Sequence, residues 1–349
     1  MSRRKWMLLP IAALLSIPAC LAQKPPAADH HAHLQSAIAA RLLNESGPTR
    51  KSPEKAYTAR DLIAVLDAAG ISQAVALSDA YRFGAPWLKV PEEAAQVERE
   101  NAWTLAQAAK YPGRLVPFCS VNPLKGYAEA AVRHCYAEGM RGLKLHLANS
   151  GFRFDRPQDV RALASIFHTA NHLDMAILIH LRTGEKWDSK RAMRLFFSDV
   201  LPEAPDVTVQ IAHLTGWGGY DRSTDAGLTT LLDLCAKESS VCRHVYFDIA
   251  AVLLPASAAT APAGSDERML ADEQADFPES SQRLATNLRR IGMHRILFAT
   301  DWPEITPAEY VSILRSRLPL KPRELDQIFR NRAPYFRTAT SSGRPARNR

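Results

Sequence analysis

The 349-residue chain lacks the signatures of several large protein classes. No dinucleotide fingerprint or phosphate loop follows a predicted strand, and TGWGG at 215–219 has the wrong glycine spacing for either. There is no G-x-S-x-G segment, which argues against a serine hydrolase with a nucleophile elbow. The five cysteines form no CxxC pair, which argues against a zinc ribbon or a thioredoxin-like site.

The net positive charge almost disappears once the chain ends are set aside. The formal charge is +8, but removing seven terminal cations lowers it to +1. The body of the protein therefore carries no basic surface of the kind that binds nucleic acid, and we expect no such partner. The seven cations are Arg3, Arg4, Lys5, Arg337, Arg344, Arg347 and Arg349.

The N-terminus predicts an export signal at residues 1–22. A basic start precedes an apolar run at 7–17, which is too short to span a bilayer as a helix. SRRKWM at 2–7 is typical of a twin-arginine leader, with an ordinary secretory leader as the alternative. We therefore expect an exported, periplasmic protein without a membrane span.

The sequence allows two forms of the mature protein. Cleavage after Ala22 gives a soluble protein, whereas IPAC at 17–20 resembles a bacterial lipobox and would place a lipid anchor on Cys20.

In an oxidising compartment Cys235 and Cys242 could form a disulfide across a helix end. Two buried free thiols are the alternative.

Short apolar runs alternate with amphipathic stretches over residues 27–336, which predicts βα units and a parallel sheet. Eight such runs favour one domain with a closed (β/α)8 TIM barrel over an open doubly wound sheet. The expected strands span 27–33, 73–77, 115–121, 142–147, 176–180, 207–213, 245–249 and 296–300. The expected helices span 58–70, 92–110, 128–138, 157–171, 190–200, 228–236, 281–291 and 307–315.

Three further segments have a local interpretation. Thr58 and Asp61 open the first helix as a capping box. Residues 251–279, rich in Ala, Pro and acidic side chains, form either a lid over the barrel or a disordered insertion. Residues 337–349 are polar and basic, and we expect a disordered tail.

Residue types that bind metals stand at the ends of the predicted strands. DHHAH at 29–33 ends the first strand, where alternation places His31 and His33 on one face and His30 on the other. The fifth and sixth strands end at His180 and His213. Asp301, in TDWP at 300–303, follows the eighth. Because a barrel brings the carboxyl ends of its strands to one rim, we expect a metal site there.

These motifs resemble the amidohydrolase-related family of the amidohydrolase superfamily over residues 27–336. That family includes metal-dependent hydrolases and non-oxidative decarboxylases of aromatic and muconate-type acids. The resemblance implies that His31, His33, His180 and Asp301 bind a divalent metal, commonly zinc, with an open position for water. It also implies that Asp301 accepts the proton of that water and delivers it to the leaving group.

The number of metal ions depends on His213 and Lys144. In one-metal members the histidine matching His213 stays off the metal and polarises the substrate, whereas in two-metal members it is a ligand. GLKLH at 142–146 resembles the segment in which two-metal relatives carry a carbamylated lysine. Alternatively, Lys144 pairs with Asp301 or binds a substrate carboxylate. We expect one ion rather than two.

Four more residues are candidates for substrate contact. His146 points the same way as Lys144, with a structural histidine as the alternative. Arg182 could hold a carboxylate bidentately or form a surface salt bridge. Trp217 and Trp302 could wall an apolar pocket or serve packing.

The sequence therefore predicts a metal-dependent hydrolase that cleaves an amide, ester or lactone bond of a small molecule by metal-activated water. A non-oxidative decarboxylase with the same one-metal site is the first alternative. The second is a non-catalytic exported binding protein. The intact set of metal-binding residues argues against a binding protein, because burying their charges without a cation costs on the order of several kcal/mol.

Overall fold

The computed structural model describes residues 24–46, 55–184 and 187–338. The predicted export signal, with its possible anchor at Cys20, lies outside these residues, as do residues 339–349 of the predicted tail. Residues 337 and 338 belong to the helix Tyr335–Thr338, so the predicted start of the disordered tail at residue 337 is wrong. Within the described part, no helix combines the length and the apolar character needed to cross a membrane.

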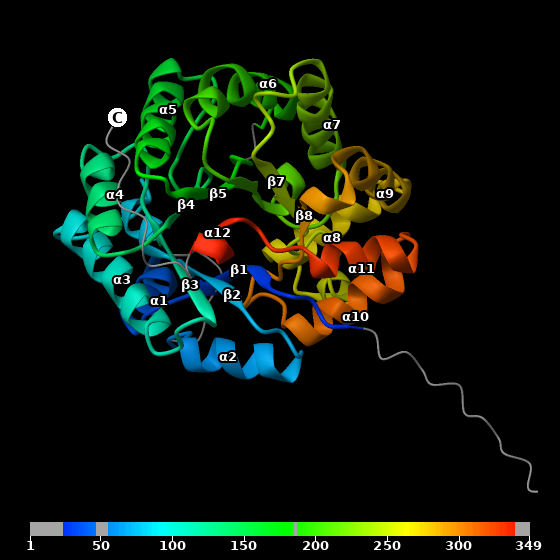
Figure 1. Ribbon diagram of the computed structural model, residues 1–349, viewed down its shortest axis with the longest axis horizontal. Coiled ribbons are helices and arrows are strands. Elements are labelled where there is room, and N and C mark those ends of the chain that lie inside the picture. The colour runs from blue at the N-terminus through cyan, green and yellow to red at the C-terminus, as the bar shows by residue number, and fades with distance from the viewer. Residues whose placement is uncertain (1–23, 47–54, 185–186, 339–349) are drawn as a thin grey trace, which may run out of the picture.

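The predicted barrel is confirmed. Eight parallel strands follow one another around the sheet in chain order, and helices surround them (Figure 1). Each strand overlaps one of the predicted apolar runs. The strands are β1 (Asp29–Leu34), β2 (Ala74–Ser78), β3 (Leu115–Ser120), β4 (Gly142–His146), β5 (Ala176–His180), β6 (Val209–Ile211), β7 (Val245–Asp248) and β8 (Ile296–Leu297).

Backbone hydrogen bonds close the barrel between β1 and the segment after β8. The amide of His30 donates to Phe298 O at 3.1 Å, and the amide of Asp301 donates to His31 O at 2.8 Å. One residue pair further, the amide of His33 donates to Trp302 O at 2.7 Å. The backbone of the first and last predicted metal-binding segments is thereby held side by side.

The helices form an outer layer on the barrel. The predicted capping box is confirmed at the start of α2, where Thr58 and Asp61 satisfy each other's backbone amides. Four helices lie outside the predicted ranges, namely α1, α8, α11 and α12. The helices are α1 (Ala37–Ser46), α2 (Ala59–Ala68), α3 (Glu93–Ala108), α4 (Ala128–Ala137), α5 (Pro157–His172), α6 (Ser189–Leu195), α7 (Arg222–Lys237), α8 (Asp266–Ala275), α9 (Ser280–Ile291), α10 (Pro307–Arg317), α11 (Pro322–Arg330) and α12 (Tyr335–Thr338).

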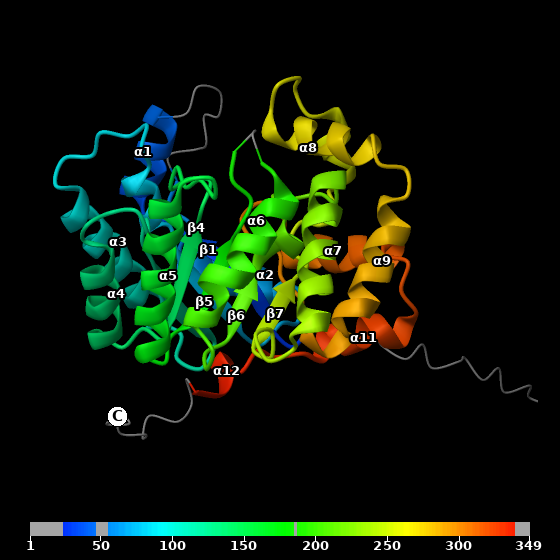
Figure 2. The ribbon, with the colours of Figure 1, turned by 90° about the horizontal axis from the view of Figure 1, so that it is seen from above.

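The two ends of the barrel differ in what covers them. Helices α1 and α8, which follow strands β1 and β7, lie at the upper end in Figure 2, where the strands finish. The segment 251–279 is therefore ordered and carries a helix at this rim, so a disordered insertion is the wrong alternative. Helix α12 lies at the lower end. Its Tyr335 and Phe336 join the apolar cluster formed by inward residues such as Phe118 and Leu178.

Cys235 and Cys242 form a disulfide that joins the last turn of α7 to the segment before β7. The alternative of two free thiols at these positions is therefore wrong. Cys119 and Cys135 are buried free thiols.

The alternation expected for the first strand is broken. A register shift lies in β1 between Asp29 and Ala32. Because a bulge adds a residue to one strand, two consecutive side chains can point to the same side. His30, predicted to face away from His31, instead contacts Tyr335 and Phe336 in the inner cluster, with ring centroids 6.2 and 5.2 Å away.

Candidate metal centre

His31 is held by a buried carboxylate that the sequence analysis missed. Its Nδ1 lies 3.1 Å from Oδ2 of Asp248, the last residue of β7. A carboxylate can only accept, so Nδ1 carries the proton and Nε2 presents a lone pair. That Nε2 lies 3.1 Å from Nε2 of His33 and 3.2 Å from Oδ1 of Asp301. Burial, and then the charge of Lys144, lower the pKa of His31 to about 3.

His33 has the same arrangement with a different partner. Its Nδ1 lies 2.6 Å from Oδ1 of Asp79, which follows β2, and its Nε2 lies 3.4 Å from Oδ1 of Asp301. Burial acts to raise the pKa of Asp79, but Arg82 and His33 lower it below its usual value. Arg82 binds the same carboxylate through Nε at 3.2 Å. Asp79 is thus an ionised acceptor that fixes the ring of His33.

His213 lies beyond β6 rather than in it. The predicted sixth strand is too long, because β6 ends at Ile211 and a tight turn covers Ala212–Thr215. Both His213 and Leu214 have left-handed backbones, with φ of 51° and 53°. The Nδ1 of His213 lies 2.8 Å from Ala250 O, so it donates there and leaves Nε2 unprotonated in the neutral ring.

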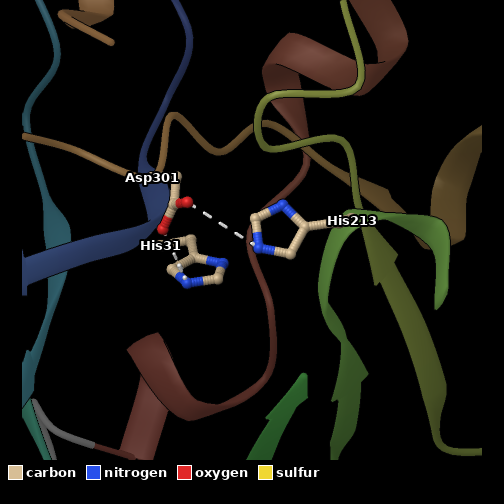
Figure 3. A group of neighbouring side chains, drawn as sticks. All are labelled: His31, His213 and Asp301. Carbon is tan, nitrogen blue, oxygen red and sulfur yellow. Dashed lines mark ion pairs between the residues drawn. The ribbon is translucent and has the colours of Figure 1, made fainter. Parts of the chain in front are cut away.

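Asp301 completes the group. Its backbone also has a left-handed conformation, with φ of 61°, and its side chain is 19% exposed. Oδ2 lies 3.8 Å from Nε2 of His213, while Oδ1 faces His31 and His33. Burial acts to raise the pKa of Asp301, but His31 and His213 hold it well below the usual range. Figure 3 shows the carboxylate of Asp301 facing the rings of both His31 and His213.

The geometry of this group could hold a metal ion. His31, His213 and Asp301 each offer one ligand atom, and the three atoms lie within 4.8 Å of one another. His31, His33 and His213 each have a hydrogen-bond acceptor at Nδ1, so a neutral ring protonated there presents its Nε2 to a metal ion. That arrangement of outer partners is typical of metal-binding histidines. The residues present therefore fit a divalent ion.

His180 supports the same interpretation from the other side. It ends β5 and is buried, yet neither ring nitrogen has a hydrogen-bond partner among the described residues. Burial, and then His213, lower its pKa well below the usual value, so the ring is neutral. Its ring lies 5.4 Å from that of His213. A buried imidazole without partners is costly unless a ligand or metal takes one nitrogen.

Lys144 lies among these histidines, at the inner face of β4. Its Nζ is 2.9 Å from Nε2 of His31, and its side chain is buried. Within the described part of the chain, Lys144 and Asp301 do not form the predicted ion pair. Burial lowers the pKa of Lys144 to about 8, although Asp301 and Asp248 act to raise it.

The predicted substrate contacts divide into two groups. His146 stacks on His180 with ring centroids 4.0 Å apart, and Trp217 meets the same ring edge-on at 5.8 Å. Arg182 binds Asp221 at 2.7 Å and Glu273 of α8 at 3.3 Å. Trp302 is buried and packs against Tyr57. His146 and Trp217 therefore lie beside the centre, whereas Arg182 and Trp302 contact other protein groups.

Comparisons with known proteins agree with this fold. A barrel whose inner rim gathers histidines and an aspartate defines a class of metal-dependent enzymes. A family model described as Amidohydrolase matches residues 28–333, and the chain belongs to that family. Its members are metal-dependent hydrolases and decarboxylases. No curated protein sequence matches the chain.

Solved structures share the fold at low sequence identity. A 5-carboxyvanillate decarboxylase from Novosphingobium aromaticivorans with bound manganese is 14% identical, with a TM-score of 0.60, and 90% of this chain and 98% of that chain align. An amidohydrolase from Burkholderia multivorans with bound zinc is 15% identical, with a TM-score of 0.55, over 87% and 96% of the two chains. A 2,6-dihydroxybenzoate decarboxylase complexed with 2,6-dihydroxybenzoate is 16% identical, with a TM-score of 0.58, over 91% and 100%. At these identities the likeness establishes the fold alone.

Proposed function

We propose that this protein is a metal-dependent hydrolase that cleaves an amide, ester or lactone bond of a small molecule. The observation that carries the proposal is the set of histidine Nε2 atoms that face the carboxylate of Asp301. Mixed imidazole and carboxylate ligands suit zinc, and His31, His33, His180 and Asp301 would hold it. A divalent ion bound there lowers the pKa of a water molecule towards neutrality and polarises a carbonyl oxygen.

Asp301 and His213 have separate roles in this proposal. Asp301 is ionised at neutral pH, because its pKa is held well below the usual range, so it can accept a proton from the attacking water. Its Oδ2 faces Nε2 of His213 at 3.8 Å. Asp301 would then deliver this proton to the leaving group, and His213 would polarise the substrate.

One ion fits the proposal better than two. A second ion would require Lys144 to become an anionic carbamate, and its Nζ is close enough to His31 to reach the same centre. Metal analysis of Lys144→Ala separates the cases. The one-ion proposal expects the metal content of the variant to match that of the wild type. Loss of one ion, restored in part by bicarbonate with a short-chain acid, would establish the carbamylated two-ion site.

A metal and activity measurement tests the proposed function. Purified protein is analysed for bound metal, stripped with a chelator, reloaded with zinc or manganese, and assayed on a panel of esters, lactones and amides. His31→Asn should lose metal and activity together. His168→Asn is the matched control, because His168 is an exposed histidine on α5 that pairs with Glu203. Hydrolysis that survives complete metal removal would overturn the proposal.

Decarboxylation of an aromatic or muconate-type acid is the second candidate. The buried ammonium of Lys144 beside His31 favours it, since a cation at the centre can hold the carboxylate of an acid substrate. Release of carbon dioxide from an aromatic acid panel, without release of acid from esters or lactones, would select this function over hydrolysis.

We also propose that the mature protein is exported. The Cys235–Cys242 disulfide supports this, because disulfides persist mainly in oxidising compartments. Mass spectrometry of the native N-terminus tests it. A start at Gln23 identifies a soluble form, and a diacylglyceryl group on Cys20 identifies an anchored form. An unprocessed Met1 in native cells would contradict both.

A further inference from the structure

A chain of hydrogen bonds runs through the barrel from helix α12 to the metal centre. The hydroxyl of Tyr335 donates to Oε1 of Gln210 at 2.6 Å. Nε2 of Gln210 donates to Oδ2 of Asp248 at 2.7 Å. The same oxygen accepts from Nδ1 of His31 at 3.1 Å. All four side chains are buried, and α12 lies at the end of the barrel opposite to the rim that carries the site (Figure 2).

The direction of the central amide is fixed by its neighbours. Nε2 of Gln210 also donates to His30 O at 3.1 Å, so two acceptors face that end of the side chain. The Tyr335 hydroxyl satisfies the oxygen at the other end. A reversed amide would set its carbonyl against the Asp248 carboxylate and the His30 carbonyl, which is repulsive. Only one orientation therefore satisfies every group in the chain.

Asp248 is saturated in this arrangement. Its Oδ1 accepts from the amides of His213 at 2.9 Å and Ala250 at 3.1 Å, and its Oδ2 accepts from Gln210 and His31. Such a carboxylate has no free lone pair directed at substrate. Its contacts instead set the tautomer of His31 and the backbone position of His213. Loss of the Gln210 donor would leave Oδ2 with one partner and free the carboxylate to turn.

Packing alone does not account for the hydroxyl of Tyr335. The ring packs edge-on against Phe118, with centroids 5.1 Å apart, and against His30. A phenylalanine would fill this space equally well. What the hydroxyl adds is a partner for the amide oxygen of Gln210, which would otherwise be buried without one.

We propose that Gln210 and Tyr335 are positioning residues of the metal centre. They act from the closed end of the barrel through Asp248 and hold His31 as the Nδ1-protonated tautomer whose Nε2 binds metal. The inference rests on the proposed metal site and adds residues that do not touch the ion. Outer partners of this kind typically change metal affinity by about 10- to 100-fold.

The test measures zinc dissociation constants by chelator competition for the full chain and two variants. We expect Gln210→Leu to weaken binding by about 10- to 100-fold. We expect Tyr335→Phe, one step further from the ion, to weaken it by about 3- to 10-fold, on the same outer-partner scale. The double variant should bind zinc like Gln210→Leu alone, because the hydroxyl reaches Asp248 through the amide of Gln210. Should Gln210→Leu fail to fold, Tyr335→Phe decides alone, since it removes one atom and no packing volume.

Tyr220→Phe is the matched control. Tyr220 is equally buried, and its hydroxyl contacts Asp225 of α7 and Asn287 of α9 in the outer helical layer. It should lose stability without losing zinc affinity. An unchanged zinc affinity in both Tyr335→Phe and Gln210→Leu would overturn the inference.

A metal-free readout separates this inference from the proposed function. Nitrogen NMR of histidine-labelled apoprotein reports which ring nitrogen of His31 is protonated. The wild type should show Nδ1 protonation, and Gln210→Leu should show a mixture of tautomers. If wild-type protein binds no metal, the proposed function falls, while this spectrum still decides whether Gln210 positions His31. An identical tautomer in wild type and variant would refute the positioning role.

Discussion

Replacing Asp301 with asparagine isolates the chemistry of its carboxylate. The backbone of Asp301 has a left-handed conformation, with φ of 61°, and asparagine adopts this conformation as readily as aspartate does. Alanine would add about 1–2 kcal/mol of backbone strain at this position. The amide side chain would also keep one oxygen near the ring nitrogens that Oδ1 now meets at 3.2 and 3.4 Å. Asp301→Asn thus removes the charge and the ability to take a proton while keeping shape and backbone.

The expected loss follows from that role. Removing a general base typically lowers turnover by about 10²- to 10⁴-fold, and weaker metal binding adds to this. The assay compares kcat/KM, metal per chain and unfolding temperature in wild type and variant, at saturating zinc. Asp225→Asn is the control, since Asp225 is a buried carboxylate that pairs with Arg283 in the helical layer. If fully metallated Asp301→Asn turned over an established substrate at near wild-type rate, the mechanism proposed here would be wrong.

Three further predictions concern other parts of the molecule. His213→Asn should abolish turnover and leave metal content unchanged if one ion is bound; loss of one ion per chain by elemental analysis would instead make His213 a ligand. Glu100 accepts two hydrogen bonds from Ser36, and burial raises its pKa from 4.5 to about 7, so its contribution to stability is lost as pH rises through 7. Relative to wild type, Glu100→Gln should therefore gain about 3 kcal/mol between pH 4.5 and 8 in urea unfolding, and parallel curves would exclude this cost. Replacing Cys235 and Cys242 by serine should lower the unfolding free energy by about 2–3 kcal/mol, and an unchanged value would show that the bridge constrains little.

Most of the barrel could be predicted because each strand is a short apolar run that helices cover on one face and the inner cluster on the other. The rim residues follow from the same rule, since a parallel barrel leaves its strand ends at one edge. His180 ends β5, His31 lies within β1 and Asp301 follows β8, so residue type and position near a strand end together marked them. The misplaced end of the sixth strand has a local cause. The chain turns left-handed at His213, which hydrophobic pattern does not reveal.

The partners of these residues could not be predicted in the same way. Asp79 follows the second strand and Asp248 ends the seventh. A rule that sought any acidic residue at a strand end would have found both. Gln210 and Tyr335 carry no such signal. A glutamine inside a strand and a tyrosine in a short C-terminal helix become meaningful only when the barrel closes and brings residues 125 positions apart into contact.

The backbone at the rim of the barrel is strained where it positions the residues of the site. Within the described residues, His213, Leu214, Thr215, Ala251 and Asp301 all have positive φ, and all five lie in the segments that leave β6, β7 and β8. Each non-glycine residue in this conformation costs about 1 kcal/mol or more, so the surrounding barrel must offset the strain. The hydrogen bonds that do so are the ones that also orient the site: His213 N to Asp248, Asp301 N to His31 O, and Nδ1 of His213 to Ala250 O. Because the same contacts stabilise the strained turns and aim the ligands, a substitution that relaxes one of these turns should disturb metal binding before it unfolds the protein.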